Sequence, residues 1–188
     1  YVRTTADILR STAFIDGRQP FWSAEKRERI GIDEECETGS KNRGPSRFIF
    51  HVSFCGSTLL AQLLNCPGKT LTLKEPKALI DLSDQLVTLP QKERDSASRV
   101  VAQLLHLLTE MQGDREKVVI KPSNWCNAIL PDLCSPSSNS IAVFISIDRR
   151  EFLKAVFRGG RDRMAYVVWA TDHVVASQPD AQIWFKEA

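Results

Sequence analysis

The stretch FIFHVSFCGSTLLAQLL, residues 48–64, contains two apolar runs of different period, separated by Gly56, Ser57 and Thr58. The first run, RFIFHV (47–52), is short and consists largely of aromatic and β-branched residues, which predicts a buried strand. The second, STLLAQLLN (57–65), has leucines at helical spacing and is followed by Cys-Pro-Gly, a helix stop signal. The stretch therefore predicts a strand, a short loop and a helix.

Predicted strands and helices alternate along the rest of the chain. Strands that are apolar on both faces need helices on both sides, which is typical of a doubly wound, mainly parallel sheet. We therefore predict an α/β fold of the P-loop nucleotide-binding type over 46–188, preceded by a helical or loop extension over 1–45. The further apolar strands are expected at 70–74, 117–121 and 140–147.

Composition excludes several classes of protein. The net charge of +2 gives no indication that nucleic acid or a membrane surface is a partner. No apolar stretch approaches the roughly 20 residues that are needed to span a bilayer. The five cysteines form no CxxC pair and the three histidines are far apart, so we predict reduced thiols, no metal site and a cytoplasmic protein.

The loop before the first helix has the composition of a phosphate site. Ligands of parallel α/β sheets bind at the carboxyl ends of the strands, where this loop is predicted to lie. Gly56 permits a backbone conformation that a side chain would hinder. The amides of the first helical turn have no partner inside the helix and, with the helix dipole, favour an anion. The hydroxyls of Ser57 and Thr58 add two donors. The alternative is an ordinary turn with a small polar helix cap.

The GxxxxGK[ST] pattern of nucleoside triphosphatases is absent. FHVSFCGSTLLAQLL instead resembles the phosphosulfate-binding loop of the sulfotransferase family. LTLKEP, VVIKPSNW and ISIDRREFLKAVFRGGR follow in the order of the strand ends of divergent bacterial members. The resemblance covers residues 47–163.

The resemblance implies that 3'-phosphoadenosine 5'-phosphosulfate is the donor and that a small molecule accepts the sulfuryl group. The loop would hold the 5'-phosphosulfate, and an arginine after the fourth strand would hold the 3'-phosphate. The residues predicted to bind the cofactor in this way are Phe54, Cys55, Gly56, Ser57, Thr58, Arg149 and Arg150. The chain departs from the family pattern at two places. The family has a basic residue at the position of Phe54, and it has a serine near the position of Lys154 or Ala155.

A second group of arginines surrounds Gly159 and Gly160. Arg158, Arg161 and Arg163 could clamp a phosphate or sulfate, with the glycine pair as a hinge. Alternatively, these arginines are cations near a helix C-terminus that glycine stops. We include Arg158 and Arg161 among the predicted cofactor-binding residues.

Two charged residues at strand ends are the predicted catalytic residues. Glu75 follows the second strand and could act as the general base on an acceptor hydroxyl. The alternative is an acid favoured by the dipole of the next helix. Lys121 ends the third strand and could supply the cation that is missing at Phe54, or it is a solvated strand-end lysine.

Three classes of function remain open. The preferred one is a sulfotransferase-like transferase that acts on a hydroxyl or an amine. The second is a small-molecule kinase that uses ATP and Mg²⁺, with Asp148 and Ser57 or Thr58 as metal ligands. The third is a non-catalytic nucleotide-binding or interaction domain, which the departures at Phe54 and at the missing serine would favour.

Overall fold

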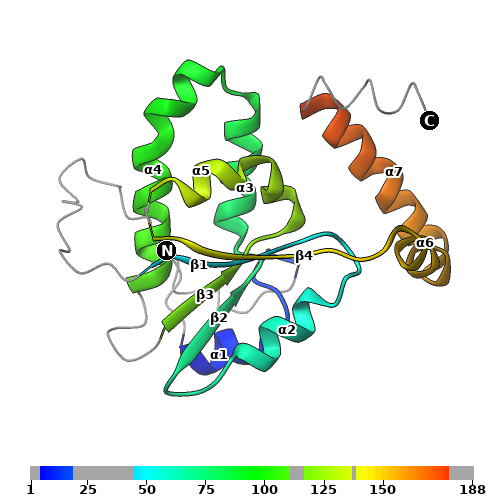
Figure 1. The fold of residues 1–188 in the computed structure, drawn as a ribbon, viewed down its shortest axis with the longest axis horizontal. Coiled ribbons are helices and arrows are strands. Elements are labelled where there is room, and N and C mark those ends of the chain that lie inside the picture. The colour runs from blue at the N-terminus through cyan, green and yellow to red at the C-terminus, as the bar shows by residue number, and fades with distance from the viewer. Residues whose placement is uncertain (1–4, 19–44, 111–116, 137–138, 178–188) are drawn as a thin grey trace. The chain divides into compact units, whose positions relative to one another are not determined.

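The computed structural model describes residues 5–18, 45–110, 117–136 and 139–177 (Figure 1). The chain forms two compact units, which are described separately. The first comprises Tyr1–His51 and Gly56–Phe144, and the second comprises Val52–Cys55 and Ile145–Ala188. Most of the predicted extension over 1–45 lies outside the described residues. No helix among the described residues has the length and apolarity that crossing a membrane requires.

The core of the fold is a four-stranded, all-parallel sheet with the order β2-β3-β1-β4. The predicted parallel α/β arrangement is therefore confirmed. Phe48 of β1 and Leu73 of β2 both align with Ile120 of β3, which lies between these two strands. The strands are β1 (Arg47–His51), β2 (Thr70–Lys74), β3 (Lys117–Lys121) and β4 (Ile141–Ile145).

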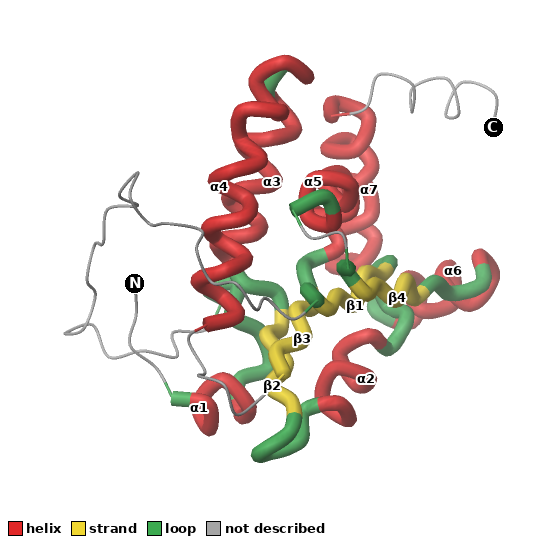
Figure 2. Tube along the Cα trace, turned by 60° about the vertical axis from the view of Figure 1, so that its left-hand side comes forward, coloured by secondary structure: helices red, strands yellow, loops and turns green. Residues whose placement is uncertain are grey.

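Helices cover both faces of the sheet in the first unit. Helices α3, α4 and α5 lie on one side, and α1 and α2 lie on the other (Figures 1 and 2). The bounds in this unit are α1 (Ala6–Ser11), α2 (Ser57–Leu64), α3 (Lys77–Thr88), α4 (Gln91–Glu110), the 3-10 helix η3 (Asn124–Ile129) and α5 (Leu130–Cys134).

Burial on both faces explains the continuous apolar character of the first three strands. Four of the five residues in each of β1, β2 and β3 are buried. Phe48 and Phe50 stack with their ring centres 5.3 Å apart in the hydrophobic core. On α2, the small and fully buried Ala61 brings the helix close to the strands.

The fourth strand differs from the prediction of a buried strand over 140–147. It covers Ile141–Ile145, and Ile141, Val143 and Phe144 are 54%, 51% and 53% exposed. The physical reason is its place at one edge of the sheet, where the helices described for this unit do not enclose both of its faces. An apolar sequence alone does not distinguish an edge strand from a central one.

The second unit contains two consecutive helices. They are α6 (Arg149–Arg158) and α7 (Gly160–Ser177). Gly159 ends α6, and its amide donates to the carbonyl oxygens of Ala155 and Val156 at 3.2 and 3.0 Å. Gly160 has a φ of +67° at the start of α7, a conformation that favours glycine. The glycine pair thus separates two helices, as the sequence predicts for a helix stop.

Candidate functional site

The loop between β1 and α2 contains two residues with a positive φ. Gly56 is the N-cap of α2 and has a φ of +81°, and Phe54 also has a positive φ, of +63°. A non-glycine residue in this region is uncommon and is strained relative to ordinary conformations. The carbonyl of Gly56 accepts from the amides of Leu59 and Leu60 at 3.0 and 3.3 Å, which begins the helical ladder.

The amides on the N-terminal side of this ladder are available to a ligand. Within the described residues, the backbone amides of Gly56, Ser57 and Thr58 donate to no protein acceptor. A side chain added at Gly56 would have no atom within 4 Å of its Cβ, so there is open space beside the loop. Free amides, a helix N-terminus and open space together suit an oxyanion.

In the second unit, Phe54 is a packing residue. Its ring centre lies 5.8 Å from that of Phe152 on α6 and 6.0 Å from that of Tyr166 on α7. The Tyr166 hydroxyl is also 2.9 Å from the hydroxyl of Ser53. The residue that replaces the basic side chain of the sulfotransferase pattern therefore attaches the loop to both helices of its unit.

A cation nevertheless lies against this part of the loop. The Cζ atom of Arg163 is 4.9 Å from the ring centre of Phe54, and its Nη1 donates to the carbonyl of Ala155 at 2.7 Å. The side chain crosses Gly159, where an added Cβ would lie 1.8 Å from the Cδ of Arg163. Of the arginines around the glycine pair, Arg163 is the one that contacts Phe54. The sequence pattern instead favours Arg158 and Arg161 as cofactor-binding residues.

The four arginines that were predicted to bind the cofactor lie on exposed parts of α6 and α7. Arg149 and Arg150 are in the first turn of α6, Arg158 is its last residue, and Arg161 follows in α7. The carboxylate of Asp148 caps α6, because its Oδ1 accepts from the amides of Arg150 and Glu151 at 2.8 and 3.4 Å. These positions leave the arginines accessible to a ligand, and Asp148 acts as a helix cap.

A second cluster lies at the carboxyl ends of three neighbouring strands in the first unit. Lys121 Nζ, from the end of β3, lies 2.5 Å from Oε1 of Glu75, which follows β2. His51, from the end of β1, has its Nε2 3.8 Å from the same oxygen and 3.1 Å from the carbonyl oxygen of Pro122. The parallel order of the strands brings these residues together, although sequence analysis treated Glu75 and Lys121 separately and did not predict His51.

This cluster is buried. Lys121 is 0% exposed, which shows that the alternative of a solvated strand-end lysine is wrong. Glu75 is 9% exposed and has a φ of +55°. Its amide donates to the carbonyl of Lys121 at 2.7 Å, so the strained backbone is fixed by the adjoining strand. The carboxylate is therefore held in one place by both its backbone and its ionic partner.

Residues 14–18 cover one side of the cluster. The amide of Ile15 donates to the carbonyl of Lys74 at 2.8 Å, and the amide of Lys77 donates to the carbonyl of Ile15 at 2.9 Å. These bonds place Phe14 with its ring centre 5.9 Å from Lys121 Nζ. Arg18 follows and donates from Nη2 to Oε2 of Glu75 at 3.3 Å. Residues 14–18 are thus part of this cluster, although no local sequence pattern indicates their contact with Glu75.

Burial also perturbs two groups next to the site. Lys74, which precedes Glu75, is 1% exposed, and its Nζ donates to the carbonyl of Arg10 at 2.9 Å. Desolvation lowers the pKa of Lys74 below its ordinary value. Cys126 of η3 is fully buried with its thiol 3.4 Å from the carbonyl of Leu79, and desolvation raises the pKa of Cys126 to about 12.

Comparisons with protein-family models, with curated proteins and with solved structures found no match to this chain. The function is therefore inferred from the chemistry of the loop and of the buried cluster.

Proposed function

We propose that the chain binds 3'-phosphoadenosine 5'-phosphosulfate and transfers its sulfuryl group to a hydroxyl or amine of a small molecule. The observation that carries the proposal is the set of amides at residues 56–58 that find no acceptor in the described part of the chain, next to open space at Gly56. The likeness of the loop to the sulfotransferase pattern favours a phosphosulfate over other anions. Phosphosulfate oxygens would accept from these amides and from the hydroxyls of Ser57 and Thr58.

Arg163 is a cation beside Phe54 in the second unit. Its guanidinium is held at Phe54 by stacking and by its bond to Ala155. Phe54, at the position where the sulfotransferase pattern has a basic residue, is thus the support for a cation that comes from α7.

Glu75 is the proposed general base, and Lys121 is the residue that positions it. Lys121 engages Oε1, so Oε2 faces the Arg18 side of the cluster. In the transfer, an acceptor oxygen or nitrogen forms a bond to sulfur while the bond from sulfur to the phosphate oxygen breaks. The leaving phosphate keeps the electron pair, and the acceptor proton moves to Oε2. Catalysis is chiefly positioning and charge stabilisation.

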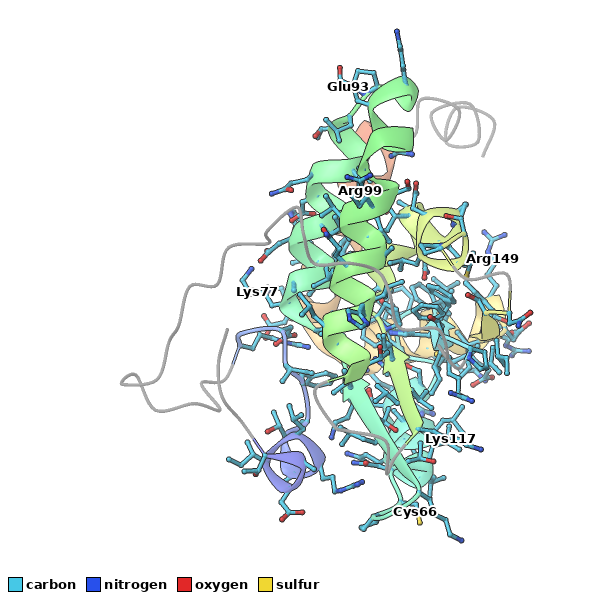
Figure 3. The ribbon with its side chains drawn as sticks, turned by 90° about the vertical axis from the view of Figure 1, so that its left-hand side faces the viewer. Cys66, Lys77, Glu93, Arg99, Lys117 and Arg149 are labelled. Carbon is cyan, nitrogen blue, oxygen red and sulfur yellow. The ribbon has the colours of Figure 1, made fainter. Side chains whose placement is uncertain are left out.

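The experiment is a calorimetric titration with 3'-phosphoadenosine 5'-phosphate, with ATP and Mg²⁺, and with ATP and a chelator. Gly56→Val is expected to abolish binding of the bisphosphate. Gly68→Val is the matched control, because Gly68 also has a positive φ, of +75°, and open space around its Cβ. Gly68 lies in the turn before β2, and Cys66 and Lys117 mark this amino end of the strands (Figure 3).

Each outcome decides between the proposals. Loss of bisphosphate binding in Gly56→Val, with binding retained in Gly68→Val, supports the phosphosulfate site. Magnesium-dependent ATP binding that is lost in the same variant would instead support the kinase alternative. Equal binding by both variants would exclude the loop as the site. No binding of any nucleotide by the native chain would support a non-catalytic interaction domain. Thermal melting of both variants checks that each is folded.

A further inference from the structure

The carboxylate of Glu75 belongs to a niche that already holds a cation. The niche is formed by Phe14, Asp16 and Glu75, and the guanidinium of Arg18 occupies it. Arg18 Cζ lies 4.2 Å from the ring centre of Phe14. Its Nη2 donates to Oε2 of Glu75 at 3.3 Å, and its Nε donates to Oδ2 of Asp16. An aromatic face with two carboxylates at its rim is suited to a planar or compact organic cation.

The burial of the partners is unequal. The side chain of Arg18 is 62% exposed, whereas those of Asp16 and Glu75 are 8% and 12% exposed. The walls of the niche are therefore fixed within the protein, while its occupant lies largely in water. An ion pair with such an exposed side chain contributes only about 0–1 kcal/mol. Arg18 can consequently leave at a small cost. The carboxylate of Asp16 then loses this cation, whereas that of Glu75 keeps Lys121.

We propose that this niche is the acceptor subsite, that it takes the protonated amino group of a small molecule, and that Arg18 fills it when no ligand is bound. The inference rests on the proposed function and selects an amine over a hydroxyl as the acceptor. Lys121 binds Oε1 of Glu75, and the guanidinium of Arg18 donates to Oε2. The acceptor nitrogen would take the place of the guanidinium next to Oε2.

The chemistry of the step follows from this position. The bound ammonium gives one proton to Oε2 of Glu75 and becomes a neutral amine with a lone pair. The nitrogen attacks sulfur, the bond from sulfur to the phosphate oxygen breaks, and that oxygen keeps the electron pair. The new N–S product releases its second proton to solvent. A guanidinium remains protonated in proteins, so a guanidinium compound would bind in the niche without reacting.

Methylguanidinium is therefore the probe, and its binding is followed by NMR titration of the full chain without nucleotide. Arg18→Ala is expected to bind it about two- to sixfold more tightly than the native chain, because the weakly held internal competitor is absent. Asp16→Asn in the Arg18→Ala background is expected to lose most of that gain. Lys154→Ala is the matched control, since Lys154 is an exposed cation of the second unit whose partner is Glu151, at 2.5 Å.

Two results would overturn the inference. One is binding by Arg18→Ala that is no tighter than binding by the native chain. The other is an unchanged affinity in the variant that also lacks the Asp16 carboxylate. Because nucleotide is absent, failure here alongside normal bisphosphate binding would reject only the amine subsite. Tight methylguanidinium binding by a chain that binds no nucleotide would reject the transferase while supporting the niche as a cation site.

Discussion

Arg163 lies with its guanidinium over the ring of Phe54, at 4.9 Å from Cζ to the ring centre. The two residues are more than a hundred positions apart in the sequence and belong to the same unit. Gly159 makes the arrangement possible, because the arginine stem occupies the space that a side chain at this glycine would fill. A loop that lacks a basic residue thereby obtains one from a distant helix.

This contact gives the first prediction. Gly159→Ala should displace Arg163, since the new Cβ would lie 1.8 Å from Cδ. Loss of the contacts of Arg163 with Phe54 and Ala155 should lower the free energy of unfolding by about 1 kcal/mol, as should Arg163→Met. Arg161→Met is the control, because it removes an exposed arginine of the same helix. Urea denaturation measures the variants, and an unaltered free energy of unfolding in both Gly159→Ala and Arg163→Met would contradict the prediction.

The second prediction concerns the buried ion pair. Lys121→Met leaves the carboxylate of Glu75 buried without its nearest cation, and we expect the free energy of unfolding to fall by about 3 kcal/mol. Glu75→Gln in the same background should restore part of the loss. Lys77→Met removes an exposed pair with Asp81 and should change stability by less than about 1 kcal/mol. Urea denaturation measures all four proteins, and equal losses for the two lysine variants would contradict the prediction.

The third prediction follows from the Cys126 thiol. Its pKa is about 12 in the folded chain against an ordinary value of 9.0. Between these pH values the unfolded chain releases a proton that the native chain keeps, so the free energy of unfolding should fall as pH rises above 9. Below pH 9 the thiol contributes no pH dependence. Cys126→Ala should have a shallower decline between pH 8 and 10, and Cys66→Ala, which alters an exposed thiol, should match the native chain.

Lys74 acts in the opposite direction and gives the fourth prediction. Burial lowers its pKa below the ordinary value of 10.5, so the unfolded chain binds more protons between the lowered value and 10.5. In that window Lys74 makes the free energy of unfolding rise with pH, and below it the full cost of burying the charge remains. Lys74→Met should remove this rise. Denaturant titrations at several pH values compare Lys74→Met with Lys77→Met. If the free energy of unfolding changes with pH equally in the two variants, the prediction is wrong.

The sequence predicts the two strands β2 and β3 well because each is followed by a strong local signal. The strands at 70–74 and 117–121 agree with β2 and β3 to the residue. Pro76 and Pro122 follow these strands closely and prevent their continuation. The turn at Gly56 is predictable for a similar reason, because its φ of +81° favours glycine, and a glycine between a strand and a helix is visible in the sequence.

The remaining parts of the site depend on contacts between distant residues. The pairing of Glu75 with Lys121 follows from the adjacency of β2 and β3, which the sequence leaves open. Arg18 reaches Glu75 across 57 positions, and no periodicity or motif marks its segment. For His51 the sequence gives only a weak indication of a place in the cluster. A polar residue at the end of a buried strand needs a hydrogen-bond partner, which for His51 is the carbonyl oxygen of Pro122.

The exposed edge strand β4 has a consequence for the handling of the protein. Its five residues, IAVFI, carry no charge, and three of them are more than half exposed. An uncharged apolar edge is a template on which the backbone of another chain can add and start aggregation. Concentrated preparations should therefore precipitate on storage, and Val143→Lys is expected to keep them clear without altering any residue that would contact a ligand.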